Sequence, residues 1–188
     1  MQKWVLDSVF AWDAPRGRCL HAAPEPFLRQ LLTGHFAEYV TCDLDPRGVD
    51  MQVDLRDTGL PDAWCDCVYA SHVLEHIDDD GKALAEISRI LRPGGVAVLP
   101  VPLVSDETVE FPEAVERESF HVRAPGPDYF ERYRRHFSRM EIFQSVNAPE
   151  QFQTYVYEDR TGYPNERNPY RTPQAGDCHP DMVPVCVK

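Results

Sequence analysis

The sequence lacks an excess of positive charge. It contains 19 Lys and Arg residues against 31 Asp and Glu residues, which gives a formal net charge of −12 at pH 7. Such a charge repels the phosphate backbone of nucleic acids and the anionic surface of membranes. We therefore expect no nucleic-acid partner and no membrane partner, and we predict that the protein acts on a small molecule or another protein.

Long apolar runs are also absent. No stretch approaches the roughly 20 apolar residues that cross a bilayer, and residues 1–16 carry neither a basic segment nor a long apolar one. We expect a soluble, cytoplasmic protein. A chain of 188 residues is long enough for one domain with a sizeable core and too short for two full ones.

The six cysteines form no CxxC pair of the kind that holds structural zinc. Most of them lie in apolar, strand-like runs, so we predict reduced, buried thiols. Cys65 and Cys67 flank Asp66. On a regular strand both sulfurs would point to one face of the sheet and the aspartate to the other.

Apolar runs alternate with helical patterns along the chain. Residues 18–22, 38–45, 51–55, 66–71, 96–102 and 182–188 are predicted strands. Helices are predicted between Pro26 and Gly34, from about Asp80 to Leu91, and over residues 127–137. Strands that alternate with helices indicate an α/β fold with a parallel sheet.

We expect a single domain over residues 1–188. It divides into an N-terminal segment (1–17), a core (18–145) and a Pro-rich region (146–188) that ends in a candidate last strand. Residues 154–171 of that region contain four tyrosines. They can cover a small-molecule pocket, or form an interface with a second copy of the chain or another protein, or remain a solvated loop.

Ligands of open parallel sheets bind beyond the carboxyl ends of the strands. Asp43 lies at the end of the second predicted strand and is placed to accept both hydroxyls of a ribose, with Asp45 as an adjacent alternative. Asp54 and Leu55 lie at the end of the third predicted strand. They are candidates to accept the amino group of an adenine and to pack on its face.

Three segments carry a family resemblance. They are CDLDP (42–46), VDLRDTGLPDAWCDCVYASHVLEHI (53–77) and ALAEISRILRPGGVAVLPVP (83–102). In this order they resemble the class I S-adenosylmethionine-dependent methyltransferases, and the resemblance covers roughly residues 18–145. It implies a Rossmann-like three-layer sandwich with a mostly parallel sheet and an antiparallel last strand. It also implies S-adenosylmethionine as the cofactor and a small-molecule acceptor such as a sugar, a natural product or another metabolite.

The predicted cofactor-binding residues follow from this resemblance and from the strand ends. They are Ala22, Ala23, Glu25, Asp43, Leu44, Asp54, Leu55, Ser71 and His72.

The first loop departs from the family pattern. The family has a DxGxGxG loop there, whereas this chain reads LHAAPEP (20–26) and has no glycine in it. The small side chains of Ala22 and Ala23 can still let the cofactor approach the backbone, and Glu25 is a candidate to bind its ammonium group. The departure leaves an alternative, a catalytically inactive methyltransferase-like protein with a binding or scaffolding role.

Two further residues lie in the later segment SFHVRAPG. His121 is the predicted catalytic residue, because an imidazole can take a proton from a hydroxyl or amine acceptor as the methyl group arrives. Arg123 is expected to pair either with an acidic acceptor or with the protein's own carboxylates.

Residues 72–76 spell HxxEH, the pattern of the inverted zinc proteases. That chemistry needs both histidines on one helical face and a third protein ligand. Here the segment lies between a buried strand and an amphipathic helix, so we expect no metal ligand among the site residues. In the methyltransferase interpretation His72 lies near the cofactor, while Glu75 and His76 position the loop.

Overall fold

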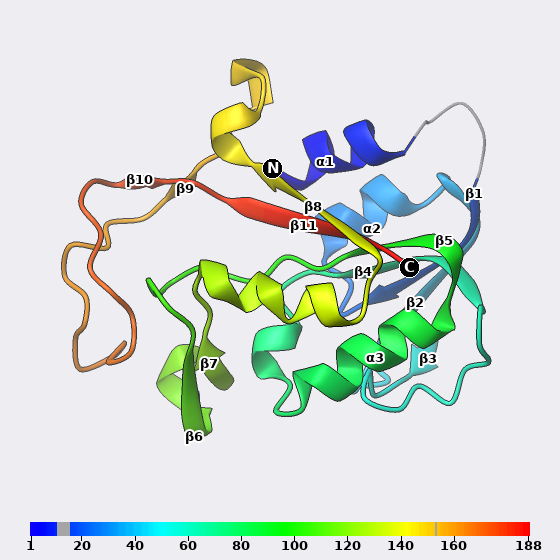
Figure 1. Ribbon diagram of the computed structural model, residues 1–188, viewed down its shortest axis with the longest axis horizontal. Coiled ribbons are helices and arrows are strands. Elements are labelled where there is room, and N and C mark those ends of the chain that lie inside the picture. The colour runs from blue at the N-terminus through cyan, green and yellow to red at the C-terminus, as the bar shows by residue number, and fades with distance from the viewer. Residues whose placement is uncertain (11–15, 153) are drawn as a thin grey trace.

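A seven-stranded sheet forms the centre of the computed structural model, which describes residues 1–10, 16–152 and 154–188 (Figure 1). The strand order is β3-β2-β1-β4-β5-β11-β8. Residues 11–15 of the predicted N-terminal segment and residue 153 of the Pro-rich region lie outside the described residues. The strands are β1 (Arg16–Ala22), β2 (Phe36–Asp43), β3 (Met51–Gln52), β4 (Cys65–Ala70), β5 (Leu91–Val98), β8 (Arg139–Gln144) and β11 (Met182–Val187).

Most neighbouring strands in this sheet are parallel. Strand β1 pairs in parallel with both β2 and β4, and β4 pairs in parallel with β5. Strand β11 runs antiparallel to β5 on one side and to β8 on the other. The predicted fold class is therefore confirmed, including the antiparallel last strand.

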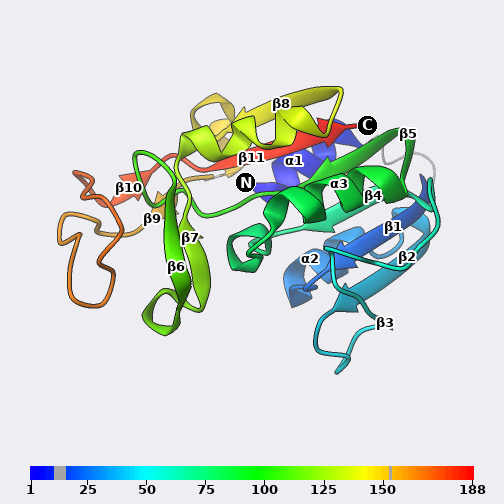
Figure 2. The same cartoon turned by 60° about the horizontal axis from the view of Figure 1, so that its bottom comes forward.

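Helices cover both faces of the sheet (Figure 2). Helices α1 (Gln2–Val9) and α2 (Pro26–Leu32) pack on one face, where Leu6 and Leu28 join a buried cluster. Helix α3 (Asp80–Ile90) packs on the other face. The three layers have the Rossmann-like arrangement that the family resemblance implied. Within the described ranges, every helix is too short or too polar to span a bilayer.

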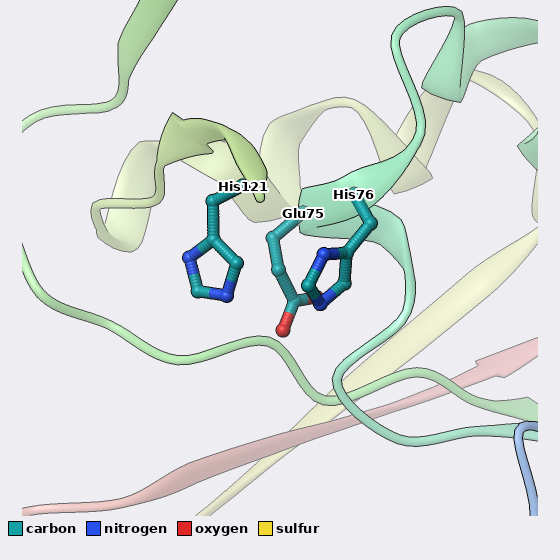
Figure 3. A group of neighbouring side chains, drawn as sticks. All are labelled: Glu75, His76 and His121. Atoms are coloured by element: carbon teal, nitrogen blue, oxygen red, sulfur yellow. The ribbon is translucent and has the colours of Figure 1, made fainter. Parts of the chain in front are cut away.

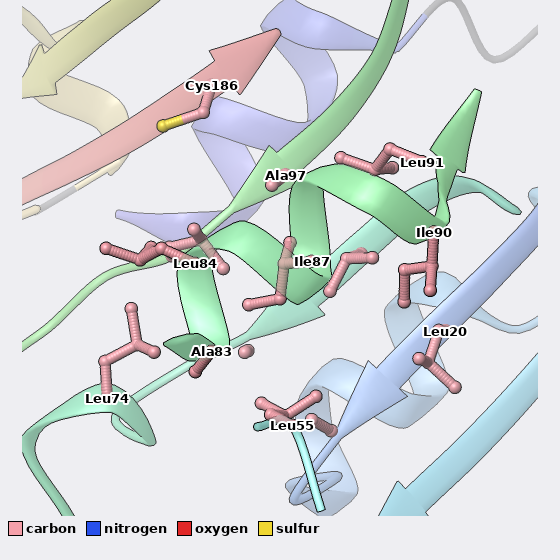
Figure 4. Close-up of a cluster of buried hydrophobic side chains, with 14 of the residues drawn as sticks. Leu20, Leu55, Leu74, Ala83, Leu84, Ile87, Ile90, Leu91, Ala97 and Cys186 are labelled. Carbon is pink, nitrogen blue, oxygen red and sulfur yellow. The ribbon is translucent and has the colours of Figure 1, made fainter. Parts of the chain in front are cut away.

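A side-chain cap and a change of backbone conformation explain where α3 begins and ends. The side chain of Asp79 accepts a hydrogen bond from the backbone N–H of Lys82 (2.9 Å), which caps the first turn. Buried side chains then recur at helical spacing and meet strands β1, β5 and β11 (Figure 4). The helix ends at Ile90 because Leu91 adopts an extended conformation and begins β5. The predicted helix from about Asp80 to Leu91 is confirmed.

The segment 127–137 differs from the helix predicted for it. It forms two 3-10 helices, η3 (Pro127–Glu131) and η4 (Tyr133–Arg135). The hydroxyl of Tyr129 donates to Asp80 Oδ2 (2.7 Å), and that of Tyr133 donates to the carbonyl of Leu99 (3.0 Å). These buried contacts with other parts of the chain accompany the tighter turns. Phe130 and Phe137 of the segment are buried as well.

A hairpin absent from the predictions projects beside the sheet. Strands β6 (Val109–Val115) and β7 (His121–Ala124) pair antiparallel (Figure 1). Ser119 and Phe120 make the turn in the left-handed region, at φ +61° and +62°. The charged sequence of β6 has little of the apolar alternation that indicates a strand. The hairpin matters for the site because it carries His121.

The prediction that Cys65 and Cys67 share a face is wrong. The pairing of β4 with β5 shifts register between these two residues. Cys65 consequently joins the core on the α3 side, and Cys67 joins the core on the side of α1 and α2. An irregularity of this kind breaks the two-residue alternation on which the prediction depended. The cysteines are free thiols, as predicted, and all but Cys178 are buried.

Glu86 of α3 ties the helix to the loop before β4. Its carboxylate accepts hydrogen bonds from Arg89 Nε (2.7 Å), from Thr58 Oγ1 (2.6 Å) and from the backbone N–H of Thr58 (2.9 Å). The hydrogen bonds from Arg89, supported by those from Thr58, lower the pKa of Glu86 from 4.5 to about 2. The charged form is thus favoured in the folded protein.

This lowered pKa predicts a pH dependence of stability. The contribution of Glu86 is present above pH 4.5 and is lost as the pH falls towards 2. Urea unfolding at several pH values should therefore show Glu86→Gln less stable than the parent at pH 7, with the difference shrinking as the pH falls. Glu131→Gln is the control, because that side chain is 67% exposed beside Arg134. A difference for Glu86→Gln that stays constant with pH would contradict the assignment.

Candidate active site

A cavity of about 700 Å³ opens at the carboxyl ends of β1, β2 and β4. The sheet order reverses at this place, because β2 and β3 lie on one side of β1 while β4 and β5 lie on the other. Neighbouring loops therefore diverge and leave a crevice. Seven of the nine predicted cofactor-binding residues line it: Ala22, Ala23, Asp43, Leu44, Asp54, Leu55 and His72.

The loop after β1 turns sharply although it lacks glycine. Ala23 adopts φ +47°, in the left-handed region that favours glycine. Its backbone N–H donates to the carbonyl of Cys42 (2.8 Å), so β2 holds the turn in place. An alanine thus makes the close turn that the family makes with glycine. The conformation costs about 1–2 kcal/mol.

A second strained residue lies in the loop after β4. His72 adopts φ +54°, and its backbone N–H donates to the carbonyl of Pro100 (2.9 Å). Both His72 and Ala23 line the cavity. Backbone strain of this kind concentrates at functional sites, because it persists only where the surrounding structure enforces it.

The structure distinguishes the two acids after β2. Asp43 lines the cavity, and its Oδ1 accepts a hydrogen bond from the backbone N–H of Asp45 (3.0 Å). Asp45 does not line the cavity and instead binds Arg47 Nε (2.9 Å). This pairing with Arg47 lowers the pKa of Asp45. Asp43 is therefore the acid that a ligand in the cavity can meet.

The acid after β3 already has a partner. Asp54 Oδ2 accepts from Arg56 Nη2 (2.7 Å), and Arg56 Nη1 also binds Asp78 Oδ1 (2.6 Å). The hydrogen bond from Arg56 lowers the pKa of Asp54. Leu55 next to it is buried and offers an apolar surface to the cavity.

The remaining two predicted cofactor residues lie outside the cavity lining. Ser71 Oγ accepts a hydrogen bond from Gln2 Nε2 (3.0 Å) and donates to Glu25 Oε1 (3.4 Å). The side chain of Gln2 also pairs with the hydroxyl of Tyr69. Helix α1 therefore occupies the end of β4 where Ser71 and Glu25 were expected to meet a ligand. No pattern in the sequence predicted α1 there.

Glu75, His76 and His121 lie together beside the cavity (Figure 3). Glu75 and His76 belong to the 3-10 helix η1 (Leu74–His76), and His121 begins β7. The HxxEH pattern thus lacks the α-helix that places two zinc-protease histidines on one face. Of these three residues, His76 lines the cavity.

The environments of His121, which is buried, and of His72, whose side chain is partly exposed, differ. Burial lowers the pKa of His121 to about 4, so its ring is neutral at pH 7. For His72 burial alone would lower the pKa, but the attraction of Glu75, Glu25 and Asp181 together raises it. His72 Nδ1 lies 3.5 Å from Glu75 Oε1. A base with the pKa of His121 is weak at neutral pH.

Arg123 fixes the segment that carries these groups. It is 1% exposed, and its guanidinium donates to the carbonyls of Leu74 (2.6 Å), Ile77 (2.6 Å) and Asp78 (3.0 Å). It also pairs with Glu110 (3.1 Å), so the expectation that it meets the protein's own carboxylates is confirmed. Arg123 therefore joins β7 to η1, and its burial was not visible in the sequence.

The Tyr-rich region packs against the hairpin. Tyr170 stacks on Phe111 of β6, with ring centroids 4.4 Å apart, and Phe111 lines the cavity. The buried Arg160 donates to the carbonyl of Leu103 (2.8 Å). Part of this region thus packs behind the cavity wall, but none of residues 154–171 lines the cavity, and a role in covering it stays a prediction. An interface with a second copy or another protein stays a prediction.

Replacing Arg123 tests its structural role. Arg123→Met leaves several buried carbonyls without their donor, at about 1–3 kcal/mol for each unsatisfied group. We expect the free energy of unfolding in urea to fall by about 3 kcal/mol or more. The control Arg117→Met removes an exposed arginine from the same hairpin and should change it by less than about 0.5 kcal/mol. Equal losses in the two variants would refute the role of Arg123.

Sequence comparisons point to one family. Residues 27–99 match the profile of a family described as "Methyltransferase domain". A dimethylglycine N-methyltransferase of Parasynechococcus marenigrum is 34% identical over 64 residues, which are 31% of this chain and 23% of that protein. The chain matches less than a quarter of the length of its curated relatives.

Solved structures agree on the fold. A Haemonchus contortus phosphoethanolamine N-methyltransferase, solved with phosphomonomethylethanolamine and S-adenosylhomocysteine, has a TM-score of 0.64 at 17% identity, covering 100% of this chain and 52% of that one. The [4+2]-cyclase SpnF has a TM-score of 0.60 at 14% identity, covering 98% and 80%. At these identities the likeness establishes the fold and not the reaction. Together with the strand order, these structures show that the chain has the fold of the class I S-adenosylmethionine-dependent methyltransferases, and residues 27–99 match the methyltransferase-domain profile.

Proposed function

We propose that this protein transfers a methyl group from S-adenosylmethionine to a small-molecule acceptor. The observation that carries the proposal is the cavity at the reversal of the sheet, where Asp43 and the left-handed turn at Ala23 share one wall. Its volume of about 700 Å³ lies within the range typical of small-molecule sites.

The residues present suit the cofactor. The tight turn at Ala23 brings backbone rather than a long side chain to the cavity, which suits the methionine portion. Asp43 would accept the ribose hydroxyls, and Leu55 would pack against the adenine. When bound, the cofactor supplies an electrophilic methyl group on a positively charged sulfur.

The protein's own contribution is mainly positioning. Methyl transfer from a sulfonium is an in-line displacement, which holding the two reactants in the right geometry can accelerate greatly. The strained loops at Ala23 and His72 are held by backbone hydrogen bonds that they donate to Cys42 of β2 and to Pro100 in the loop after β5, so they form a rigid wall. The hairpin β6–β7 forms another wall.

The charges around the cavity favour a small acceptor that is neutral or positively charged. Five acids and two arginines line it: Asp43, Asp54, Asp78, Glu110 and Glu113, with Arg56 and Arg123. Together with the net charge of −12, this surface opposes a phosphate-rich polymer. Two of the similar proteins named above are N-methyltransferases of small amine compounds, which supports an acceptor of this size.

A second candidate function is binding without methyl transfer, or another reaction on the same fold. Two observations favour it. The first loop has no glycine, and one similar structure is named as a cyclase. In this case the cavity would hold a different ligand, or S-adenosylmethionine would bind without turnover.

Calorimetric titration with S-adenosylmethionine and S-adenosylhomocysteine tests the proposal. We expect both to bind, and Asp43→Ala to weaken binding by about 10- to 100-fold, because a charged hydrogen-bond acceptor is worth roughly 1.5–3 kcal/mol. Asp45→Ala is the matched control, since that adjacent acid does not line the cavity. Absence of binding to the folded, monodisperse protein would reject the cofactor assignment and favour the second candidate.

A further inference from the structure

The histidine and glutamate cluster beside the cavity is not explained by cofactor binding. Glu75, His76 and His121 each offer one ligand atom, and these atoms all lie within 4.8 Å of one another. The two imidazole rings meet edge to face with centroids 4.6 Å apart. The Glu75 carboxylate lies beside them (Figure 3). Two separate parts of the chain, η1 and the start of β7, therefore converge on one point.

Glu75 is the unusual member of this cluster. Its side chain is 1% exposed, and among the described residues neither carboxylate oxygen has a hydrogen-bond partner. The Nδ1 atom of His72 lies 3.5 Å from Glu75 Oε1. This contact becomes an ion pair when His72 is protonated, but it is not a hydrogen bond. A buried carboxylate without hydrogen bonds carries a desolvation penalty of several kcal/mol. Buried charges in proteins are paired or coordinate metals.

The surrounding structure holds the cluster in place. Arg123 binds the carbonyls of Leu74 and Ile77, which flank Glu75 and His76 in the sequence. The same arginine lies two residues after His121 on β7. One buried side chain thus fixes both parts of the chain that supply the cluster. Preorganisation of this kind is what a ligand site requires.

We propose that Glu75, His76 and His121 bind a divalent transition-metal ion of the zinc type. Two imidazole nitrogens and one carboxylate oxygen are a donor set that suits such ions, whereas magnesium and calcium favour oxygen ligands alone. Two atoms that bind the same zinc ion are at most about 4.2 Å apart. A small side-chain rotation is therefore enough to bring the ligand atoms, which now lie within 4.8 Å of one another, to binding distance. The exposed His76 has the freedom for it.

This site differs from the zinc-protease pattern in the sequence. That pattern would use His72 and His76 as ligands with Glu75 as the base. In the structure the second imidazole comes from His121, and Glu75 itself offers a ligand atom. His121 then serves as a ligand and not as a proton acceptor.

The site also suggests a role in the reaction, which rests on the proposed function. His76 lines the cavity, and three protein ligands leave a coordination position open. An acceptor hydroxyl that takes this position releases its proton to solvent more readily. Its oxygen lone pair then forms the bond to the methyl carbon, and the electron pair of the broken carbon–sulfur bond remains on sulfur.

Metal binding can be measured without cofactor or acceptor. The full chain, stripped with a chelator, is titrated with Zn²⁺ by calorimetry and with Co²⁺ by visible absorption. We expect one equivalent of each ion to bind, and Co²⁺ to show the ligand-field bands of a nitrogen–oxygen site. Glu75→Gln and His76→Ala should each weaken binding by at least about tenfold, the loss that even an outer hydrogen-bond partner of a ligand causes.

One control variant and one alternative test variant keep the result decisive. His136→Asn removes a histidine outside the cluster and should leave the affinity unchanged. Because His76 is exposed, His76→Ala carries the test if Glu75→Gln fails to fold. Absence of stoichiometric binding by the parent protein, or binding that both cluster variants retain, would overturn the proposal. Failure of cofactor binding would leave this measurement unaffected, so the two proposals fail separately.

Discussion

The reversal of strand order beside β1 is the constraint on which the site depends. Strand β1 pairs in parallel with β2 and with β4, so the carboxyl ends of the three strands reach the same edge. The chain must leave that edge in two directions, which keeps the loops apart and leaves a cavity between them. Asp43, Ala23 and His72 meet there although they are far apart in the sequence.

The loops at this edge combine strain with firm support. Ala23 and His72 both adopt left-handed conformations, and each is held by a backbone hydrogen bond to another strand or the loop after it. The large buried clusters on both faces of the sheet stabilise the strands that hold them. This support explains how a glycine-free loop keeps the turn of a family that normally uses glycine there.

The sequence predicted the parts that local patterns determine. Six of the seven strands of the central sheet, α3 and the position of Asp43 followed from apolar periodicity and from the family motifs, whereas β8 was not among the predicted strands. The 3-10 turns at 127–135 were not predictable, because buried contacts of Tyr129 and Tyr133 with distant residues accompany them. The same holds for Ser71 and Glu25, which helix α1 covers through Gln2. The register shift that separates Cys65 from Cys67 is likewise a property of the paired strands.

A crystal structure of the protein grown with S-adenosylhomocysteine tests the central claim most directly. We predict that the nucleoside lies in the cavity, with its ribose hydroxyls on Asp43, its adenine against Leu55 and its amino-acid portion beside the turn at Ala23. Nucleoside density at another place on the molecule, with the cavity walls unchanged, would contradict this assignment of the site.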